Sequence, residues 1–185
     1  MIARVLLSAV LLLVLVACSR DLPASRDAAR AAGAASTAAA APTVDGDALR
    51  PSEGFDVSEV VFTDGDERVT MPVLVADHRS LRTTGLMHRT ELPAAAGMLF
   101  VFDAPTSGGF WMKDTVLPLS IAFVGAGGTV QQVLDMEPCT EDPCPLYAPD
   151  ETYLRAVEAN QGYFAAHDIT AGWSLEVDPR RGGGQ

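Results

Sequence analysis

The residue with the most distinctive chemistry in this sequence is its only lysine, Lys113, in the segment Phe110-Trp111-Met112-Lys113-Asp114-Thr115. A lysine kept among arginines indicates a need for a compact ammonium group with three donors and a readily shifted pKa. If the segment is a strand, Trp111 and Lys113 share one face, because side chains alternate. A flat ring beside an ammonium group is a platform for a sugar or a carboxylate. The alternative is a lysine stem packed over the tryptophan with its charge in water.

The partner of Lys113 and any catalytic group are less well defined by the sequence. Asp114 would point to the opposite face of the strand, so Glu158 is the candidate partner. Ser107 and Ser120 lack the Gly-x-Ser-x-Gly setting of a hydrolase nucleophile. Carboxylates are plentiful, but an acidic chain always offers pairs, so no glycosidase dyad can be assigned. Phosphate-loop and dinucleotide motifs are absent, and we expect no cofactor.

Methionine and cysteine residues offer two further kinds of site. Thioether ligands suit Cu(I), but the candidates are not closely spaced and Met commonly fills cores; they are Met87, Met98, Met112 and Met136, with His88 beside the first. We therefore expect no metal. Cys139 and Cys144 bracket a short segment with Pro143, and in an oxidising compartment we expect them to form a disulfide. A metal site is the rival, although two thiolates are too few for structural zinc.

The first part of the chain has the composition of an export and anchoring segment. Residues 1–17 have a basic start and an apolar stretch too short to span a bilayer comfortably, which predicts a signal peptide. Leu-Val-Ala-Cys resembles the lipobox of bacterial lipoproteins, so Cys18 is expected to carry lipid. An ordinary signal peptide or a membrane anchor is the alternative. Residues 18–54 are Ala-rich and predict a disordered tether, and residues 179–185 a flexible tail.

Charge narrows the range of partners. The formal net charge is −11 and no basic cluster occurs, so nucleic acid is an unsuitable partner, because binding phosphates needs grouped Lys and Arg. A lipid anchor, rather than basic residues, would hold the protein at the membrane. The predicted location is the bacterial cell envelope, facing the periplasm, with the outer membrane favoured over the inner.

Residues 55–178 predict a single compact domain that is mainly β, a β-sandwich or distorted barrel with one or two short helices. Period-two alternation and turn residues predict strands at 57–63, 68–76, 98–102, 110–113, 119–124, 130–136, 153–158 and 174–177. Pro72 should push its strand toward an edge or a bulge. Asp77 is expected to cap a helix that Gly85 ends, and Asn160 one that reaches about His167.

The sequence resembles the DUF192 family, a group of uncharacterised bacterial and archaeal proteins. The resemblance rests on Gly85 to Arg89, Gly97 to Phe102, Phe110 to Thr115 with Pro118-Leu119, Pro138-Cys139 to Tyr147, and Glu158 to Gly162. It implies a compact, mainly β domain and no established reaction. Carried over position by position, it makes Arg89, Trp111, Lys113, Thr115 and Glu158 the candidate ligand-binding residues, with no catalytic residue assigned.

Two positions depart from the family pattern, which has Asn in place of Asp114 and Asp in place of Ser120. If the family's lysine and aspartate work as a pair, Ser120 breaks that pair unless Asp114 substitutes for it. We therefore expect a non-enzymatic, envelope-tethered binding module with a groove for a small ligand or a partner around Trp111 and Lys113. A hydrolase acting on envelope carbohydrate or peptide is one alternative, and a structural or assembly lipoprotein is the other.

Overall fold

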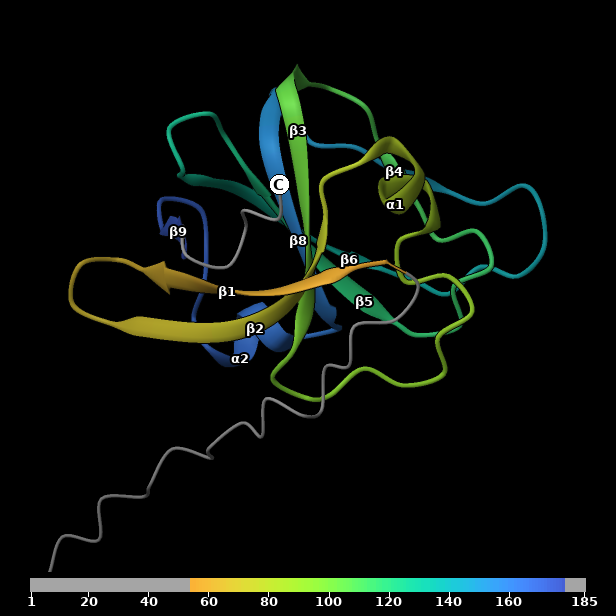
Figure 1. Ribbon diagram of the computed structural model, residues 1–185, viewed down its shortest axis with the longest axis horizontal. Coiled ribbons are helices and arrows are strands. Elements are labelled where there is room, and N and C mark those ends of the chain that lie inside the picture. Colours follow the sequence, from red (N-terminus) through yellow and green to blue (C-terminus); the bar gives the residue numbers. More distant parts are fainter. Residues whose placement is uncertain (1–53, 179–185) are drawn as a thin grey trace, which may run out of the picture. The chain divides into compact units, whose positions relative to one another are not determined.

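The computed structural model describes residues 54–178. The predicted signal peptide, Cys18, nearly all of the predicted tether and the predicted tail lie outside these residues. The elements are β1 (Asp56–Thr63), β2 (Arg68–Ala76), α1 (Arg79–Thr84), β3 (Gly97–Thr106), β4 (Phe110–Trp111), β5 (Leu119–Val124), β6 (Val130–Met136), β7 (Leu146–Tyr147), β8 (Tyr153–Asn160), α2 (Tyr163–Ala166) and β9 (Ser174–Val177) (Figure 1).

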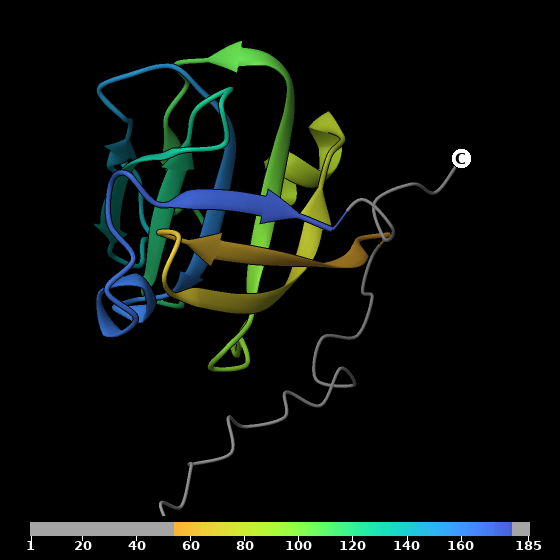
Figure 2. The same ribbon diagram turned by 90° about the vertical axis from the view of Figure 1, so that its left-hand side faces the viewer.

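The domain is mainly β, which confirms the predicted class. Seven strands form one sheet in the order β6-β5-β8-β3-β2-β1-β9, and β4 pairs with β7 in a separate ribbon. Within this sheet of residues 54–178, only the β2–β3 pair is parallel, and the chain between these strands carries α1. The sheet curls strongly, as Figure 2 shows, but does not close into a barrel. Its edges meet at one corner, where Thr129 bridges to Ser174.

Most predicted strands and both hairpins are confirmed. The turn residues 64–67 join β1 to β2, and the stretch around Gly127 joins β5 to β6, each as an antiparallel pair. Pro72 lies in an interior strand, because β2 is flanked by β1 and β3. However, β3 pairs only with Val73–Ala76. Pro72 thus lies where β2 has one free side, and its missing N–H costs no hydrogen bond to β3.

Both helix starts and the end of one strand differ from the sequence prediction. His78, not Asp77, is the N-cap of α1, and it makes no side-chain cap, although Gly85 does end this helix with φ +48°. Asn160 is still part of β8, and α2 begins only after Gly162. Strand β4 ends at Trp111, two residues before Lys113. The predicted strand at 110–113 is therefore too long, and Trp111 and Lys113 do not share a strand face.

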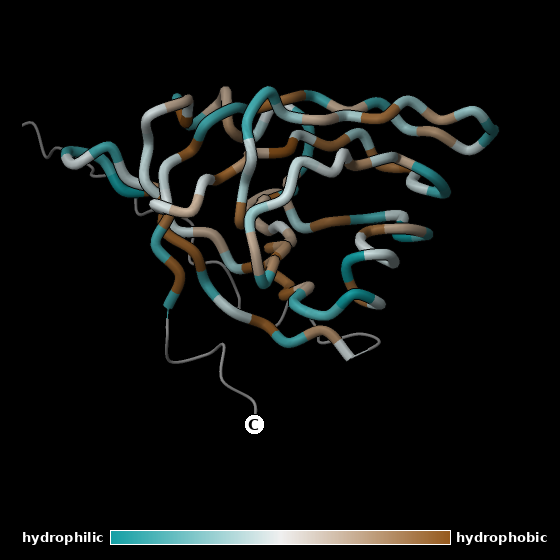
Figure 3. Tube along the Cα trace, turned by 90° about the horizontal axis from the view of Figure 1, so that it is seen from above, coloured by the Kyte–Doolittle hydropathy of each residue, from teal (hydrophilic) through white to brown (hydrophobic). Residues whose placement is uncertain are grey.

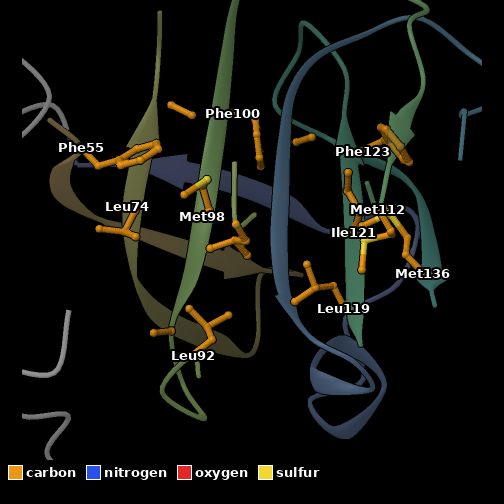
Figure 4. Close-up of a cluster of buried hydrophobic side chains, with 14 of the residues drawn as sticks. Phe55, Leu74, Leu92, Met98, Phe100, Met112, Leu119, Ile121, Phe123 and Met136 are labelled. Atoms are coloured by element: carbon orange, nitrogen blue, oxygen red, sulfur yellow. The ribbon is translucent and has the colours of Figure 1, made fainter. Parts of the chain in front are cut away.

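Two hydrophobic clusters cover the two faces of the sheet. Hydrophobic segments follow the strands, while hydrophilic residues gather at loop tips (Figure 3). One cluster includes Phe62, Val157 and Phe164 and lies beside α2 and β9. The other lies toward α1 and the β4–β7 ribbon; Figure 4 labels Phe55, Leu74, Leu92, Met98, Phe100, Met112, Leu119, Ile121, Phe123 and Met136 in it. The methionines considered as copper ligands, apart from Met87, are thus buried in this second cluster.

Candidate functional site

A cavity of about 440 Å³ lies on the sheet face that α1 and the β4–β7 ribbon cover. Strand β3 contributes Phe100, Phe102 and Thr106, and the helix contributes arginine and threonine side chains. The remaining wall comes from the turn after α1, from the segment 108–112, and from β8. Its lining residues are Arg79, Arg82, Thr83, Thr84, Gly85, Leu86, Met87, Phe100, Phe102, Thr106, Gly108, Gly109, Phe110, Trp111, Met112, Thr115, Leu119, Tyr153 and Glu158. Of the five candidate ligand-binding residues, Trp111, Thr115 and Glu158 line this cavity, whereas Lys113 and Arg89 do not.

Glu158 is the acidic residue of this lining. It pairs across β8 with Met98 of β3 and Ile121 of β5, so its side chain extends from the middle of the sheet among apolar neighbours. The residue is only 5% exposed, and within residues 54–178 nothing donates a hydrogen bond to its carboxyl group. Burial raises the pKa of Glu158 to about 8, because desolvation disfavours the charged form. At neutral pH the group is therefore mostly a carboxylic acid, able to donate and to accept a hydrogen bond.

Aromatic rings form another part of the cavity wall. Phe110 of β4 lies edge-on to Phe100, with ring centroids 4.9 Å apart, and also contacts Phe102 at 6.5 Å. Tyr153 stacks edge-on against Phe102 at 5.3 Å and donates its hydroxyl proton to the Gly108 carbonyl oxygen at 2.6 Å. Burial raises the pKa of Tyr153 to about 12. Because these rings interlock edge to face, the wall is preorganised.

Arg82 of α1 is fixed by three contacts at the rim. Its Nη1 donates to the Asp77 carbonyl oxygen at 2.5 Å and to the Val101 carbonyl oxygen at 2.8 Å. Its guanidinium carbon lies 4.9 Å from the centre of the Phe102 ring. The Nε and Nη2 donors have no protein acceptor in the described part of the chain. They leave one edge of the planar guanidinium free for a carboxylate or another anion.

Lys113 lies in a different environment, next to the disulfide loop. Its Nζ donates to Asp142 Oδ2 at 2.5 Å, and its side chain is 26% exposed. The hydrogen bond with Asp142 raises the pKa of Lys113, which keeps the ammonium charged. The prediction that Glu158 is the partner of Lys113 is wrong. Lys113 pairs with Asp142 instead, because the backbone leaves the strand at Trp111 and turns through Asp114.

Cys139 and Cys144 form the expected disulfide. The loop it closes carries Asp142 and leads into β7, where Leu146 lies opposite Trp111 of β4. Both side chains are exposed, Leu146 by 66% and Trp111 by 52%. The Cys139 N–H also donates to the Thr115 carbonyl oxygen at 3.2 Å. The disulfide loop therefore supports one wall of the cavity through β4 and Thr115.

Neither of the two departures from the family pattern, Asp114 and Ser120, lines the cavity. Asp114 has φ +52°, a left-handed conformation that Asn and Asp adopt most readily among residues with a side chain, so this replacement preserves the turn. The side chain of Ser120 points to the opposite sheet face from that of Ile121. Ile121 is the cross-strand neighbour of Glu158, so Ser120 and Glu158 lie on different faces. Its hydroxyl donates to Asp135 Oδ1 at 2.5 Å and accepts from the Gly162 N–H at 2.9 Å.

Sequence reasoning missed two residues of this lining, Arg82 and Tyr153, and the contacts of Asn160, which lies outside it. Asn160 donates from Nδ2 to the carbonyl oxygens of Leu92 and Pro93 at 3.1 and 3.2 Å, which holds the loop between α1 and β3 against β8. Its place in the Glu158 to Gly162 block was a usable signal. Arg82 and Tyr153 gave no such signal, because their roles depend on contacts with residues distant in sequence.

The fold and the site define a mainly β domain with one aromatic cavity that contains a buried acid. Its sequence belongs to the DUF192 family, described as "Uncharacterized ACR", whose pattern matches residues 60–177. No curated protein matched the chain.

Two solved structures are similar to the domain. One is a protein of unknown function from Novosphingobium aromaticivorans, with 30% identity and a TM-score of 0.63, covering 70% of this chain and 91% of that chain. The other, described as a "putative transcription regulator" from Sinorhizobium meliloti, has 25% identity and a TM-score of 0.62, covering 70% of this chain and 98% of that chain.

Proposed function

We propose that this protein is a non-enzymatic small-ligand binding module of the bacterial cell envelope, and that its site is the cavity containing Glu158. The observation that carries the proposal is the carboxyl group of Glu158, which lines a cavity of about 440 Å³ and has no protein hydrogen-bond partner among residues 54–178. The residue is only 5% exposed. Its oxygens are not among the fully enclosed unpaired side-chain atoms of the described residues, which are Ser58 Oγ and Gln131 Oε1, so the surface that they keep faces the cavity. Burying a polar group without a partner costs roughly 1–3 kcal/mol. A ligand that hydrogen-bonds to this group would offset that cost.

The dimensions and lining of the cavity suit a small molecule. Ligand pockets are usually concave and largely apolar, with a few converging polar groups. Here aromatic rings supply the apolar wall, and the polar groups include Glu158, Arg79, Arg82 and Thr115. The expected groove around Trp111 and Lys113 is accordingly redefined: Trp111 stays at its rim, whereas Lys113 belongs to the neighbouring disulfide loop.

Two other functions receive less support. A glycosidase needs two carboxyl groups that flank the scissile bond, and among residues 54–178 Glu158 is the only acid of this cavity lining. The description of the Sinorhizobium meliloti structure suggests transcription regulation, but a net charge of −11 is unfavourable for contacts with phosphates. Neither function explains why a carboxyl group is buried without a partner.

The envelope part of the proposal rests on the first 18 residues and on the disulfide. Neither helix of residues 54–178 is long and apolar enough to cross a bilayer. A disulfide between Cys139 and Cys144 is consistent with an oxidising compartment. We infer that lipid on Cys18 anchors the protein facing the periplasm. Intact-mass analysis of the membrane-extracted protein should show a chain that begins at Cys18 and carries acyl groups; a chain without acyl groups on Cys18 would show that the lipid-anchor proposal is wrong.

Native mass spectrometry of the full chain, exposed to an extract of bacterial envelopes, tests the binding function. We expect a reproducible small-molecule adduct on the native protein. It should weaken in Glu158→Gln, which removes the acid, and in Trp111→Ala, which removes the exposed rim.

Lys113→Met is the matched control, because Lys113 does not line the cavity and the adduct should survive its replacement. Melting temperatures of all variants show that they are folded. An adduct lost in Lys113→Met but retained in both cavity variants would contradict the proposal.

A further inference from the structure

Within residues 54–178, three residues with ionisable charged side chains line the cavity: Arg79, Arg82 and Glu158. Glu158 and Arg82 lie next to different positions along strand β3, which restricts the ligand that can contact both. Glu158 is directly opposite Met98 of β3. Arg82 is bonded to the Val101 carbonyl oxygen and stacked on Phe102 of the same strand. Three residues of extended strand span about 10 Å. Glu158 and Arg82 form no ion pair with each other among residues 54–178, and this spacing along β3 suits a molecule with two separate polar ends.

The surroundings of each group indicate which end it binds. The carboxyl group of Glu158 lines the same cavity as the rings of Phe100, Phe102 and Phe110, and a cation is stabilised both by a carboxylate and by ring faces. Arg82 presents the free edge of a guanidinium that is already fixed in place, which suits a carboxylate. The ring of Phe102 and the Phe110–Phe100 pair lie around the space where an apolar spacer would run.

Resting on the proposed function, we propose that the cavity takes a zwitterionic small molecule whose ammonium group binds Glu158 and whose carboxylate binds Arg82. Amino acids and short peptides have this chemistry. The spacer between the two charged ends packs against the aromatic wall.

Binding of such a ligand should release one proton from Glu158. In the empty cavity Glu158 carries a proton at neutral pH, because burial raises its pKa to about 8. An ammonium group favours the carboxylate form, so binding releases the carboxyl proton to solvent while the ligand keeps its own charge. Affinity should therefore rise as pH increases from about 6 to about 8, and then level off once Glu158 is ionised in the free protein.

Isothermal titration calorimetry of the full chain with a length series tests this inference. The probes are ω-amino acids from glycine to aminooctanoate, with alkylamines, alkanoates and alkanols of matched length. We expect one ω-amino acid to bind at least about tenfold more tightly than each single-ended analogue of its length. Titrations in buffers of different ionisation enthalpy should show that its binding releases protons, because the observed binding enthalpy will depend on the buffer.

Charge-neutral variants assign the two ends. Glu158→Gln should remove the advantage over the alkanoate and abolish proton release, and Arg82→Gln should remove the advantage over the alkylamine. The matched controls are Glu91→Gln and Arg155→Gln, since neither residue lines the cavity, and both should bind as the native protein does. If Arg82→Gln fails to fold, the length series on the native protein decides alone.

The outcomes separate this inference from the proposed function. If an alkylamine or an alkanol binds as tightly as the best ω-amino acid, the zwitterion is wrong, but the cavity remains a binding site. If no probe of any charge binds the folded native protein, both the inference and the proposed function are wrong.

Discussion

Glu158 and Lys113 both belong to the family motif, yet the fold gives them opposite surroundings. Glu158 is buried in a central strand without a protein partner, and burial raises its pKa to about 8. Lys113 lies on a loop, half-exposed and paired with Asp142. We infer from this difference that a carboxyl group with little exposure and no protein partner is a better guide to a candidate site than a rare residue type. Surface ion pairs contribute little to stability, whereas a buried carboxyl group has an energetic cost that ligand binding can offset.

The largest expected effect is on the pH dependence of stability. The native protein keeps a proton on Glu158 that the unfolded chain releases above its ordinary pKa of 4.5. The free energy of unfolding should therefore fall by roughly 1 kcal/mol for each pH unit between about 5 and 8. Denaturant titrations at several pH values measure this slope. This slope should disappear in Glu158→Gln and persist in Lys113→Met. Equal slopes in the native protein and in Glu158→Gln would contradict the contrast between the two residues.

The position of Glu158 depends on close approach of β3 to β8 at Gly97. A Cβ atom there would press against the Glu158 carbonyl oxygen and lie 2.7 Å from Met71 Sδ. Gly97→Ala should lower the free energy of unfolding by about 3 kcal/mol, because overpacking a rigid backbone costs that much. Gly127→Ala, where a Cβ would meet nothing within 4 Å, is the control and should be neutral. A stable Gly97→Ala variant would mean that β8 can shift at Glu158.

Loss of the disulfide should have a smaller effect that is concentrated on the Lys113 side. Closing so short a loop stabilises the native state by about 2 kcal/mol, so a Cys139→Ser, Cys144→Ser variant should unfold that much more easily. Hydrogen exchange should accelerate at the β4–β7 pair and leave β8 unchanged. Uniform acceleration across both sheets would show that the two regions are not energetically separate.

The smallest effect is expected for the ion pair itself. Lys113→Met and Asp142→Asn should both have the melting temperature of the native protein. The attraction between two exposed charges is largely cancelled by the loss of their hydration, so such a pair contributes little to stability. Thermal unfolding followed by circular dichroism is sufficient to measure this. Unfolding of Lys113→Met at room temperature would instead make Lys113 a structural centre of the domain.

Local features of the fold were predictable from the sequence. The hairpins of β1–β2 and β5–β6 follow from alternation and from turn residues such as Gly127, since register in a short hairpin is set locally. The disulfide likewise follows from two cysteines five residues apart in sequence. The end of β4 was not predictable, because the turn after Trp111 is held by the Asp114 carbonyl oxygen, which accepts from the distant His88 N–H.

The candidate site was only partly predictable. Family resemblance indicated Glu158, Trp111 and Thr115 as residues, and the structure brings all three to one cavity. Alternation places Glu158 on a strand face but does not say what covers that face, so neither its burial nor its neutral state could be predicted. Arg82 joins the site only because α1 packs on β3, a contact that no local pattern encodes.

The carboxyl group of Glu158 provides the most direct test of the account. Carbon-13 NMR of the full chain, with the glutamate side-chain carboxyl carbons labelled and the signal assigned by Glu158→Gln, follows its titration. We predict a titration midpoint near pH 8, which shifts downward when an ω-amino acid binds. A midpoint near the ordinary glutamate pKa of 4.5 would show a hydrated or paired carboxyl group and would contradict the account.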